Sequence, residues 1–166
     1  MKKAIRIRTS GILSEKGKVL LVQHEKNGKQ YWLLPGGGVD FGETLTEALE
    51  REFLEETSLK VKAGKPILVS EVAAPDGSRH GLHFVFLVKR ISGKLKVIPD
   101  KRLRSACFMP WEEISRLAFF PNIGRLLLTL HRRRFAAPVK FTGNIWIPGI
   151  SDKELKKGKS LLQRIK

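Results

Sequence analysis

The segment that most constrains the fold is a glycine run followed closely by an acid-rich stretch. Residues 35–38 read Pro-Gly-Gly-Gly and are predicted to form a loop, because adjacent glycines permit backbone conformations and close approaches that side chains would forbid. Of the sixteen Asp and Glu residues in the chain, seven stand between Asp40 and Glu56, where Arg51 is the single cation. Because the rest of the chain is strongly basic, this contrast indicates a functional site.

Hydrophobic periodicity predicts an α/β fold. One helix is predicted over residues 44–57, opening with a capping box formed by Thr44 and Glu47. A near-continuous apolar run at residues 19–22 is typical of a central strand. Further elements are expected as strands at 4–13, 18–24, 66–73 and 82–91, a short strand ending at Phe108-Met109-Pro110, a short helix through Ile114 and a helical pattern at 121–130.

The helix at residues 44–57 carries carboxylates on its buried side. At about 100° per residue, Glu52 and Glu56 continue the line of Leu49, and Glu55 lies on the same arc. Acids packed together and partly buried repel one another and lose hydration, a cost that a hard divalent cation with oxygen ligands offsets. The pattern therefore predicts a Mg²⁺ site, the alternative being a solvated Glu-rich helix face.

The net charge of +16 predicts polyanionic partners. Residues 131–166 hold ten cations and two anions, so the last fifth of the chain carries half of the excess. Such a surface attracts nucleotides, RNA or an anionic membrane through a salt-sensitive field, and the charge by itself does not choose among them.

Two classes of protein are excluded by composition. A single cysteine, Cys107, forms neither an internal disulfide nor a cysteine-based zinc site, and no uninterrupted apolar run is long enough to span a bilayer. Arg6 and Arg8 interrupt the apolar stretch that an export signal needs, so a cytoplasmic protein with no membrane partner is expected.

Spaced residues around the helix resemble the Nudix box. Gly37, Glu43 and the run Arg51-Glu52-Phe53-Leu54-Glu55-Glu56 stand at the spacing of that 23-residue signature, which ends here at Leu59. One fixed position departs, since Ser58 stands where the family has a glycine that ends the helix in a left-handed conformation.

The resemblance to MutT-like Nudix hydrolases implies the fold and the reaction. It implies an α/β/α sandwich with a central mixed sheet over residues 1–130. Residues 131–166 are then a basic C-terminal extension, partly ordered, that packs on the core or on a second subunit; a homodimer is left open. The implied reaction is hydrolysis of the diphosphate bond in a nucleoside diphosphate linked to another moiety, such as ADP-ribose or a nucleoside triphosphate, with Mg²⁺ or Mn²⁺ as cofactor.

The resemblance also implies roles for individual residues. Glu52, Glu55 and Glu56 match the metal-binding carboxylates, and the carbonyl of Gly36 matches a backbone ligand. Glu52 is the first candidate for the general base, with Glu56 beside it in the catalytic set. The remaining catalytic positions are Glu43 and Arg51, which are expected to orient the helix and its acids; an ion pair within the box is favoured for Arg51 over direct phosphate contact.

Residues outside the box are the candidates for substrate contact. Tyr31, His83 and Phe84 could border a base or a sugar, although His83 on an apolar strand is also typical of a satisfied core histidine. Asp100 is the candidate for a further carboxylate at the site, the alternatives being Glu71 or the helix acids alone.

Two other functions stay open at this stage. The basic charge favours a pyrophosphohydrolase acting on the 5′ end of RNA, which would bind RNA with steep salt dependence. A non-catalytic nucleotide- or RNA-binding module on the same fold is the third reading, and the intact helix carboxylates argue against it.

Overall fold

Two sheets and two α-helices build the part of the chain that the computed structural model describes, residues 4–99 and 102–145. The larger sheet has the strand order β5-β1-β7-β6-β9. In the smaller sheet β3 lies between β4 and β8, and the first two residues of β3 also pair with β2. The strands are β1 (Arg6–Ile12), β2 (Ser14–Glu15), β3 (Lys18–Lys26), β4 (Lys29–Leu33), β5 (Gly36–Gly38), β6 (Lys60–Ala73), β7 (His80–Ser92), β8 (Leu103–Pro110) and β9 (Lys140–Asn144). The helices are α1 (Leu45–Thr57), the 3₁₀ helix η1 (Trp111–Arg116) and α2 (Gly124–Arg132). Parallel pairs β1–β7 and β6–β9 stand among antiparallel ones, which confirms the predicted α/β fold with a mixed sheet.

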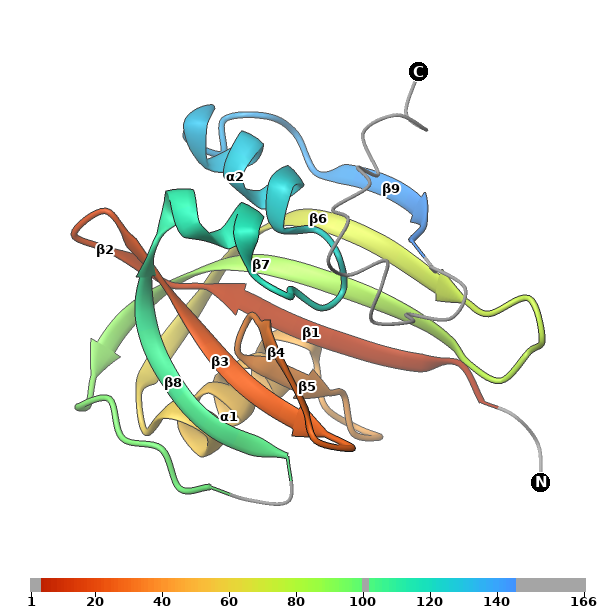
Figure 1. The fold of residues 1–166 in the computed structure, drawn as a ribbon, viewed down its shortest axis with the longest axis horizontal. Coiled ribbons are helices and arrows are strands. Elements are labelled where there is room, and N and C mark those ends of the chain that lie inside the picture. The colour runs from red at the N-terminus through yellow and green to blue at the C-terminus, as the bar shows by residue number, and fades with distance from the viewer. Residues whose placement is uncertain (1–3, 100–101, 146–166) are drawn as a thin grey trace.

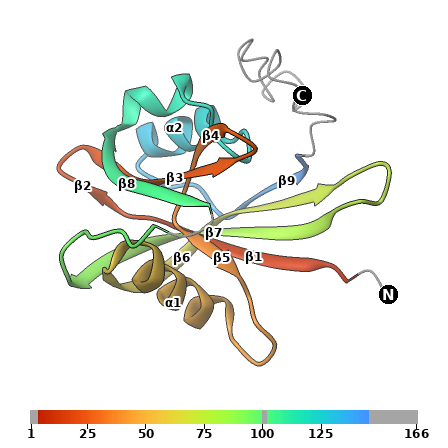
Figure 2. The ribbon, with the colours of Figure 1, turned by 60° about the horizontal axis from the view of Figure 1, so that its bottom comes forward.

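The helices cover opposite faces of the larger sheet (Figures 1 and 2). On the α1 side, Leu49 and Phe53 pack with Phe86 of β7, whereas Leu127 of α2 packs with the preceding residue, Val85. Because successive side chains of a strand point to opposite faces, one strand serves both cores. The apolar run predicted at residues 19–22 is fully buried in β3, as expected of a central strand.

The glycine run predicted as a loop is a short strand. β5 pairs antiparallel with β1, placing Gly36 opposite Ser10 and Gly38 opposite Arg8. A Cβ on Gly36 would lie 2.2 Å from the carbonyl oxygen of Thr9, and its φ of +143° is one that other residues rarely adopt. Glycine is therefore what lets this strand lie against β1 so closely.

Two further segments extend beyond the predicted bounds. β6 begins at Lys60, directly after α1, and its register shifts between Ala63 and Pro66, where proline has no N–H to donate. Towards the end of the described chain, β9 pairs with β6, and Phe135 and Ile145 are buried in the core beside α2. Packed structure thus continues to Ile145, and residues 146–166 of the basic segment lie outside the described residues.

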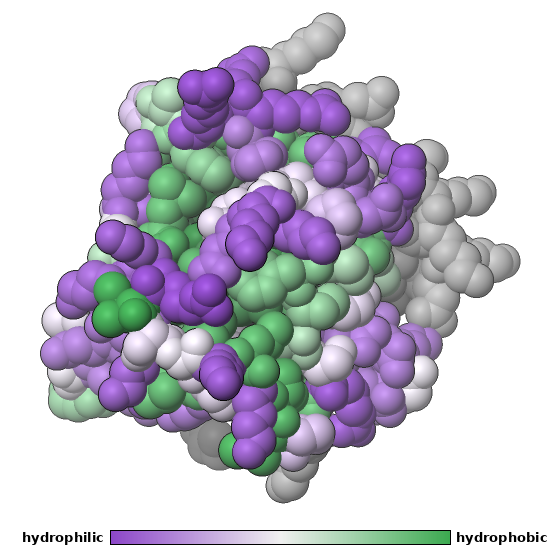
Figure 3. Space-filling view, turned by 90° about the vertical axis from the view of Figure 1, so that its left-hand side faces the viewer, coloured by the Kyte–Doolittle hydropathy of each residue, from purple (hydrophilic) through white to green (hydrophobic). Residues whose placement is uncertain are grey.

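The face of the molecule on the β2 side is mostly polar (Figure 3). On the face seen from the β2 side, hydrophilic side chains surround smaller areas of hydrophobic ones (Figure 3). No helix within the described ranges is long and apolar enough to cross a membrane.

Candidate active site

Helix α1 is fixed at both ends by its own sequence. Thr44 caps the start, accepting a hydrogen bond from the Glu47 N–H while the Glu47 carboxylate accepts one from the Thr44 N–H, which confirms the predicted capping box. At the other end, Ser58 has φ of 59° and its N–H donates to the Leu54 carbonyl. Ser58 therefore takes the left-handed conformation that glycine would adopt, and its hydroxyl donates to the Lys96 carbonyl at 2.9 Å.

Glu52 and Glu56 lie on the face of α1 that meets the glycine strand β5. Their side chains are only 17% and 12% exposed. The Glu52 carboxylate lies against Gly37, and a Cβ on Gly37 would stand 1.9 Å from Glu52 Oε1. Glu56 accepts a 2.9 Å hydrogen bond from the N–H of Gly36. The two acids are therefore seated against backbone that carries no side chains.

Burial raises the pKa of Glu52 above its ordinary value. The hydrogen bond from Arg51 opposes this rise, and the charges of Glu56 and Glu55 add to it. A carboxyl group in such surroundings holds a proton more readily than one in water.

Arg51 connects the acids of the site. Its Nε and Nη2 donate to the two oxygens of Glu43 at 2.7 and 2.9 Å, Nη2 also donates to the Gly38 carbonyl at 3.1 Å, and Nη1 donates to Glu52 at 3.0 Å. This bonding lowers the pKa of Glu43 to about 2, with a smaller contribution from the backbone N–H of Asp40. The structure thus places Arg51 in an ion-pair network within the box.

The remaining candidate metal ligands, Glu55 and the carbonyl of Gly36, make other contacts. Glu55 is 59% exposed and lies 3.5 Å from Arg51 Nη1. The Gly36 carbonyl accepts a hydrogen bond from Arg8. Among the residues that the structure describes, no three His, Cys, Asp or Glu side chains stand together as a ready metal cluster. The donor chemistry nevertheless fits a divalent cation, because Glu52 and Glu56 repel each other in a half-buried notch that a Cβ would fill.

Two neighbours of the carboxylates escaped the sequence analysis as site residues. Burial lowers the pKa of the half-buried Arg8 on β1 below its ordinary value, and the charges of Glu56 and Glu52 partly oppose this change. His24 on β3 places Nε2 3.3 Å from Glu56 Oε1. Neither belongs to a local motif, and only strand pairing brings them to α1.

The family model described as NUDIX domain matches residues 5–130. The chain belongs to the Nudix family. It is 36% identical over 116 residues to the ADP-ribose pyrophosphatase of Methanocaldococcus jannaschii, covering 68% of this chain and 66% of the relative. It is 40% identical over 85 residues to the 8-oxo-dGDP phosphatase NUDT18 of Homo sapiens, covering 51% of this chain and 25% of that protein. It is also 35% identical over 78 residues to phosphatase NudJ of Escherichia coli strain K12, covering 47% and 50%. The chain thus spans just under two thirds of the first of these curated relatives, and a half or less of the others.

Solved structures share the Nudix fold. The E. coli ORF135 protein superposes with a TM-score of 0.68 at 22% identity, covering 82% of this chain and 95% of that one. A NUDIX hydrolase from Nitrosomonas europaea gives 0.71 at 17% identity, covering 81% and 93%. At these identities the likeness establishes the fold alone.

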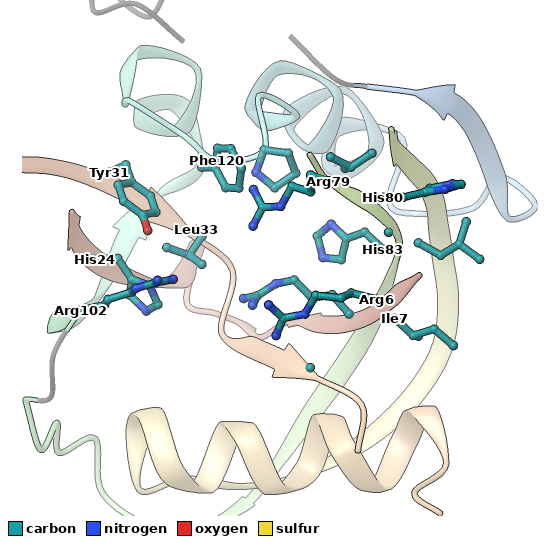
Figure 4. Close-up of a pocket in the computed structure, with 16 residues that line it drawn as sticks. Arg6, Ile7, His24, Tyr31, Leu33, Arg79, His80, His83, Arg102 and Phe120 are labelled. Atoms are coloured by element: carbon teal, nitrogen blue, oxygen red, sulfur yellow. The ribbon is translucent and has the colours of Figure 1, made fainter. Parts of the chain in front are cut away.

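The candidate substrate residues of this Nudix protein separate in space. Tyr31 and His83 line a pocket beside the carboxylates (Figure 4). Phe84 is not among the residues described as lining it, because it follows His83 on the strand and faces the core beneath α1. Asp100 lies outside the described residues, and Glu71 bonds His80 at 2.9 Å.

His83 is buried, with one ring nitrogen bonded and the other without a partner. Its Nε2 lies 2.6 Å from Ser10 Oγ, and its Nδ1 has no hydrogen-bond partner in the structure. Burial, with the charge of Arg8 added, lowers the pKa of His83 to about 3. The imidazole is therefore neutral at ordinary pH.

Proposed function

We propose that the protein hydrolyses the diphosphate bond of a nucleoside diphosphate linked to another moiety, ADP-ribose-like or a nucleoside triphosphate, in the presence of Mg²⁺ or Mn²⁺. The observation that carries the proposal is the pair Glu52 and Glu56, half-buried side by side against the side-chain-free strand β5. Family membership supports it, as does the likeness to a relative named ADP-ribose pyrophosphatase.

Glu52 and Glu56 would hold the cation, with Glu55 and the Gly36 carbonyl as further donors. When bound, such an ion polarises the phosphorus and lowers the pKa of a bound water. The chain's own contribution is to keep the two carboxylates in place: Arg51 anchors Glu52, and the Gly36 N–H anchors Glu56.

Glu52 is the proposed general base. Water attacks one phosphorus, the bridging P–O bond breaks, and the water proton passes to a Glu52 carboxylate oxygen. The hydrogen bond from Arg51 holds the Glu52 carboxylate at this face, where it can accept the proton. Glu56 already accepts the Gly36 N–H, which suits it to a holding role.

Replacement of the two acids by their amides tests the proposal. E52Q and E56Q keep shape and remove charge, so turnover of ADP-ribose and nucleoside triphosphates with Mg²⁺ should fall by about 10²–10⁴-fold, read by product mass. E50Q is the matched control on the same helix, because Glu50 contacts Lys62 and the Ala63 N–H and lies away from β5. Unchanged turnover in E52Q would overturn the assignment.

Two further outcomes would favour a different function for the protein. Binding of nucleotides without hydrolysis by the unmodified protein would support a non-catalytic module. Hydrolysis of 5′-triphosphorylated RNA alone, with affinity that falls steeply as salt rises, would support the RNA 5′-end reaction that the charge of +16 favours.

A further inference from the structure

Arginines and histidines line the pocket beside the carboxylates, and no acid is among its described lining residues. Its volume is about 190 Å³. Four arginines and three histidines line it, and none of its described lining residues is Asp, Glu, Asn or Gln. The arginines are Arg6, Arg8, Arg79 and Arg102, and the histidines are His24, His80 and His83; Figure 4 labels all of them except Arg8. Such a lining favours an anion.

The pocket and the carboxylate face share a wall. Arg8 lines the pocket and donates to the carbonyl of Gly36, whose N–H donates to Glu56 on the other side. His24 likewise lines the pocket and lies 3.3 Å from Glu56. A substrate whose diphosphate is held at the carboxylates therefore has its adjoining group beside Arg8 and His24.

Two exposed arginines, Arg79 and Arg6, have defined positions at the pocket. The guanidinium carbon of Arg79 lies 5.7 Å from the centre of the Phe120 ring, a cation–π contact that holds it at the pocket. Arg6 follows strand alternation with Arg8 on β1, and its Nη2 lies 3.8 Å from the position of a Cβ on Gly38. In Figure 4 the side chains of Arg6 and Arg79 reach into the same space.

We propose that this pocket binds a phosphate group beyond the scissile diphosphate, so that the substrate is a nucleotide with at least one more phosphate than ADP-ribose. The inference rests on the proposed function and narrows its substrate. Guanidinium groups match phosphate geometry through paired N–H donors. The diphosphate already faces the cation site, so a further anion would face Arg6 and Arg79, two exposed arginines at the pocket.

Other groups suit the pocket less well. A base edge is read by a mixture of donors and acceptors, typically amide or carboxylate side chains, which are absent from the described lining. The volume is below the range of about 300–1,000 Å³ that encloses a drug-sized ligand, so the pocket holds one part of a nucleotide. A phosphate or a phosphorylated sugar is small enough for this volume and needs no amide or carboxylate side chain to bind it.

Substrates that carry different numbers of phosphates test the inference, and the pair that differs by phosphate alone is ADP-ribose and ADP-ribose 2′-phosphate. ADP-ribose is compared with ADP-ribose 2′-phosphate, which carries the extra phosphate on a sugar, and with ATP and diadenosine tetraphosphate, which carry it in the chain. The variants are R79Q and R6Q, with R116Q as a charge-matched control because Arg116 pairs with Glu113 on η1. Turnover is measured with Mg²⁺, and equilibrium binding is measured calorimetrically on E52Q.

The extra phosphate should raise kcat/KM and affinity about tenfold or more over ADP-ribose, and R79Q and R6Q should remove that gain while R116Q keeps it. The phosphorylated sugar and the longer chain separate the two sources of the group. Equal or better use of ADP-ribose, unaffected by R79Q, would overturn the inference and leave the hydrolase assignment standing. A binding preference for the extra phosphate on E52Q, with no turnover by the unmodified protein, would support the pocket and overturn the proposed function. Binding of RNA alone would overturn the pocket assignment.

Discussion

The Glu52 carboxylate occupies the space where a side chain on Gly37 would begin. An ideal Cβ on Gly37 would lie 1.9 Å from Oε1 and 2.0 Å from Cδ of Glu52. The bare strand and the proposed base are therefore complementary, although fifteen positions separate them in the sequence. The absence of one methyl group at residue 37 sets where this carboxylate stands.

G37A should displace Glu52 and lower turnover by about tenfold or more, with little loss of stability, because the clash is with the end of a flexible side chain. G38A is the control with ADP-ribose as the substrate, because a Cβ there would meet only Arg6 Nη2, at an ordinary 3.8 Å, and ADP-ribose lacks the further phosphate proposed for Arg6. Kinetics and thermal unfolding of both variants check this. Equal turnover in the two would show that the fit between residue 37 and Glu52 is not needed.

R51K should lower kcat by about tenfold or more. A lysine keeps the charge but cannot bond Glu43, the Gly38 carbonyl and Glu52 together, as the guanidinium does. The KM for substrate should change much less, because Arg51 positions an acid and is not proposed to touch the substrate. The reverse pattern, a raised KM with kcat retained, would favour direct phosphate contact.

S58G and S58A should change stability in opposite directions. Glycine relieves the left-handed strain of residue 58, worth about 1 kcal/mol, and loses the hydroxyl bond to Lys96, so a net gain below about 1 kcal/mol is expected. Alanine keeps the strain and loses the bond, so it should destabilise the protein. Urea unfolding measures both, and a gain in S58A would contradict the assigned strain.

Acid should weaken the fold through His83. Its pKa is about 3 in the folded protein and about 6.5 when unfolded, so between these values the unfolded state binds more protons. Stability should therefore fall as pH falls from about 6.5, by up to about 1.4 kcal/mol per pH unit from this group. H83Q, which can still meet Ser10, should flatten the profile between pH 7 and 5 in urea unfolding. Parallel profiles for the two proteins would show that His83 is not the cause.

Local patterns were enough to predict the carboxylate helix. The capping box of Thr44 and Glu47 and the shared face of Glu52 and Glu56 involve residues three and four apart, which helix geometry alone places together. The apolar run at residues 19–22 likewise predicts a strand buried on both faces.

Strand pairing decided what the patterns left open. Phe84 and His83 are neighbours in sequence, yet the pleat of β7 sends one beneath α1 and the other to the pocket. The glycine run reads as a loop because nothing local shows that β1 lies beside it. Its pairing with β1 also brings Arg8 to the Gly36 carbonyl.

The sequence by itself determined the family, the mixed α/β class and the helix that carries the acids, because those depend on spacing within a few turns of one segment. Only the tertiary structure decided that Gly37 seats Glu52, that Arg8 and His24 border Glu56, and that arginines from separate strands and loops line one pocket. The physical reason is register: these contacts join residues tens of positions apart, and a one-residue slip of a strand would send every one of its side chains to the other face.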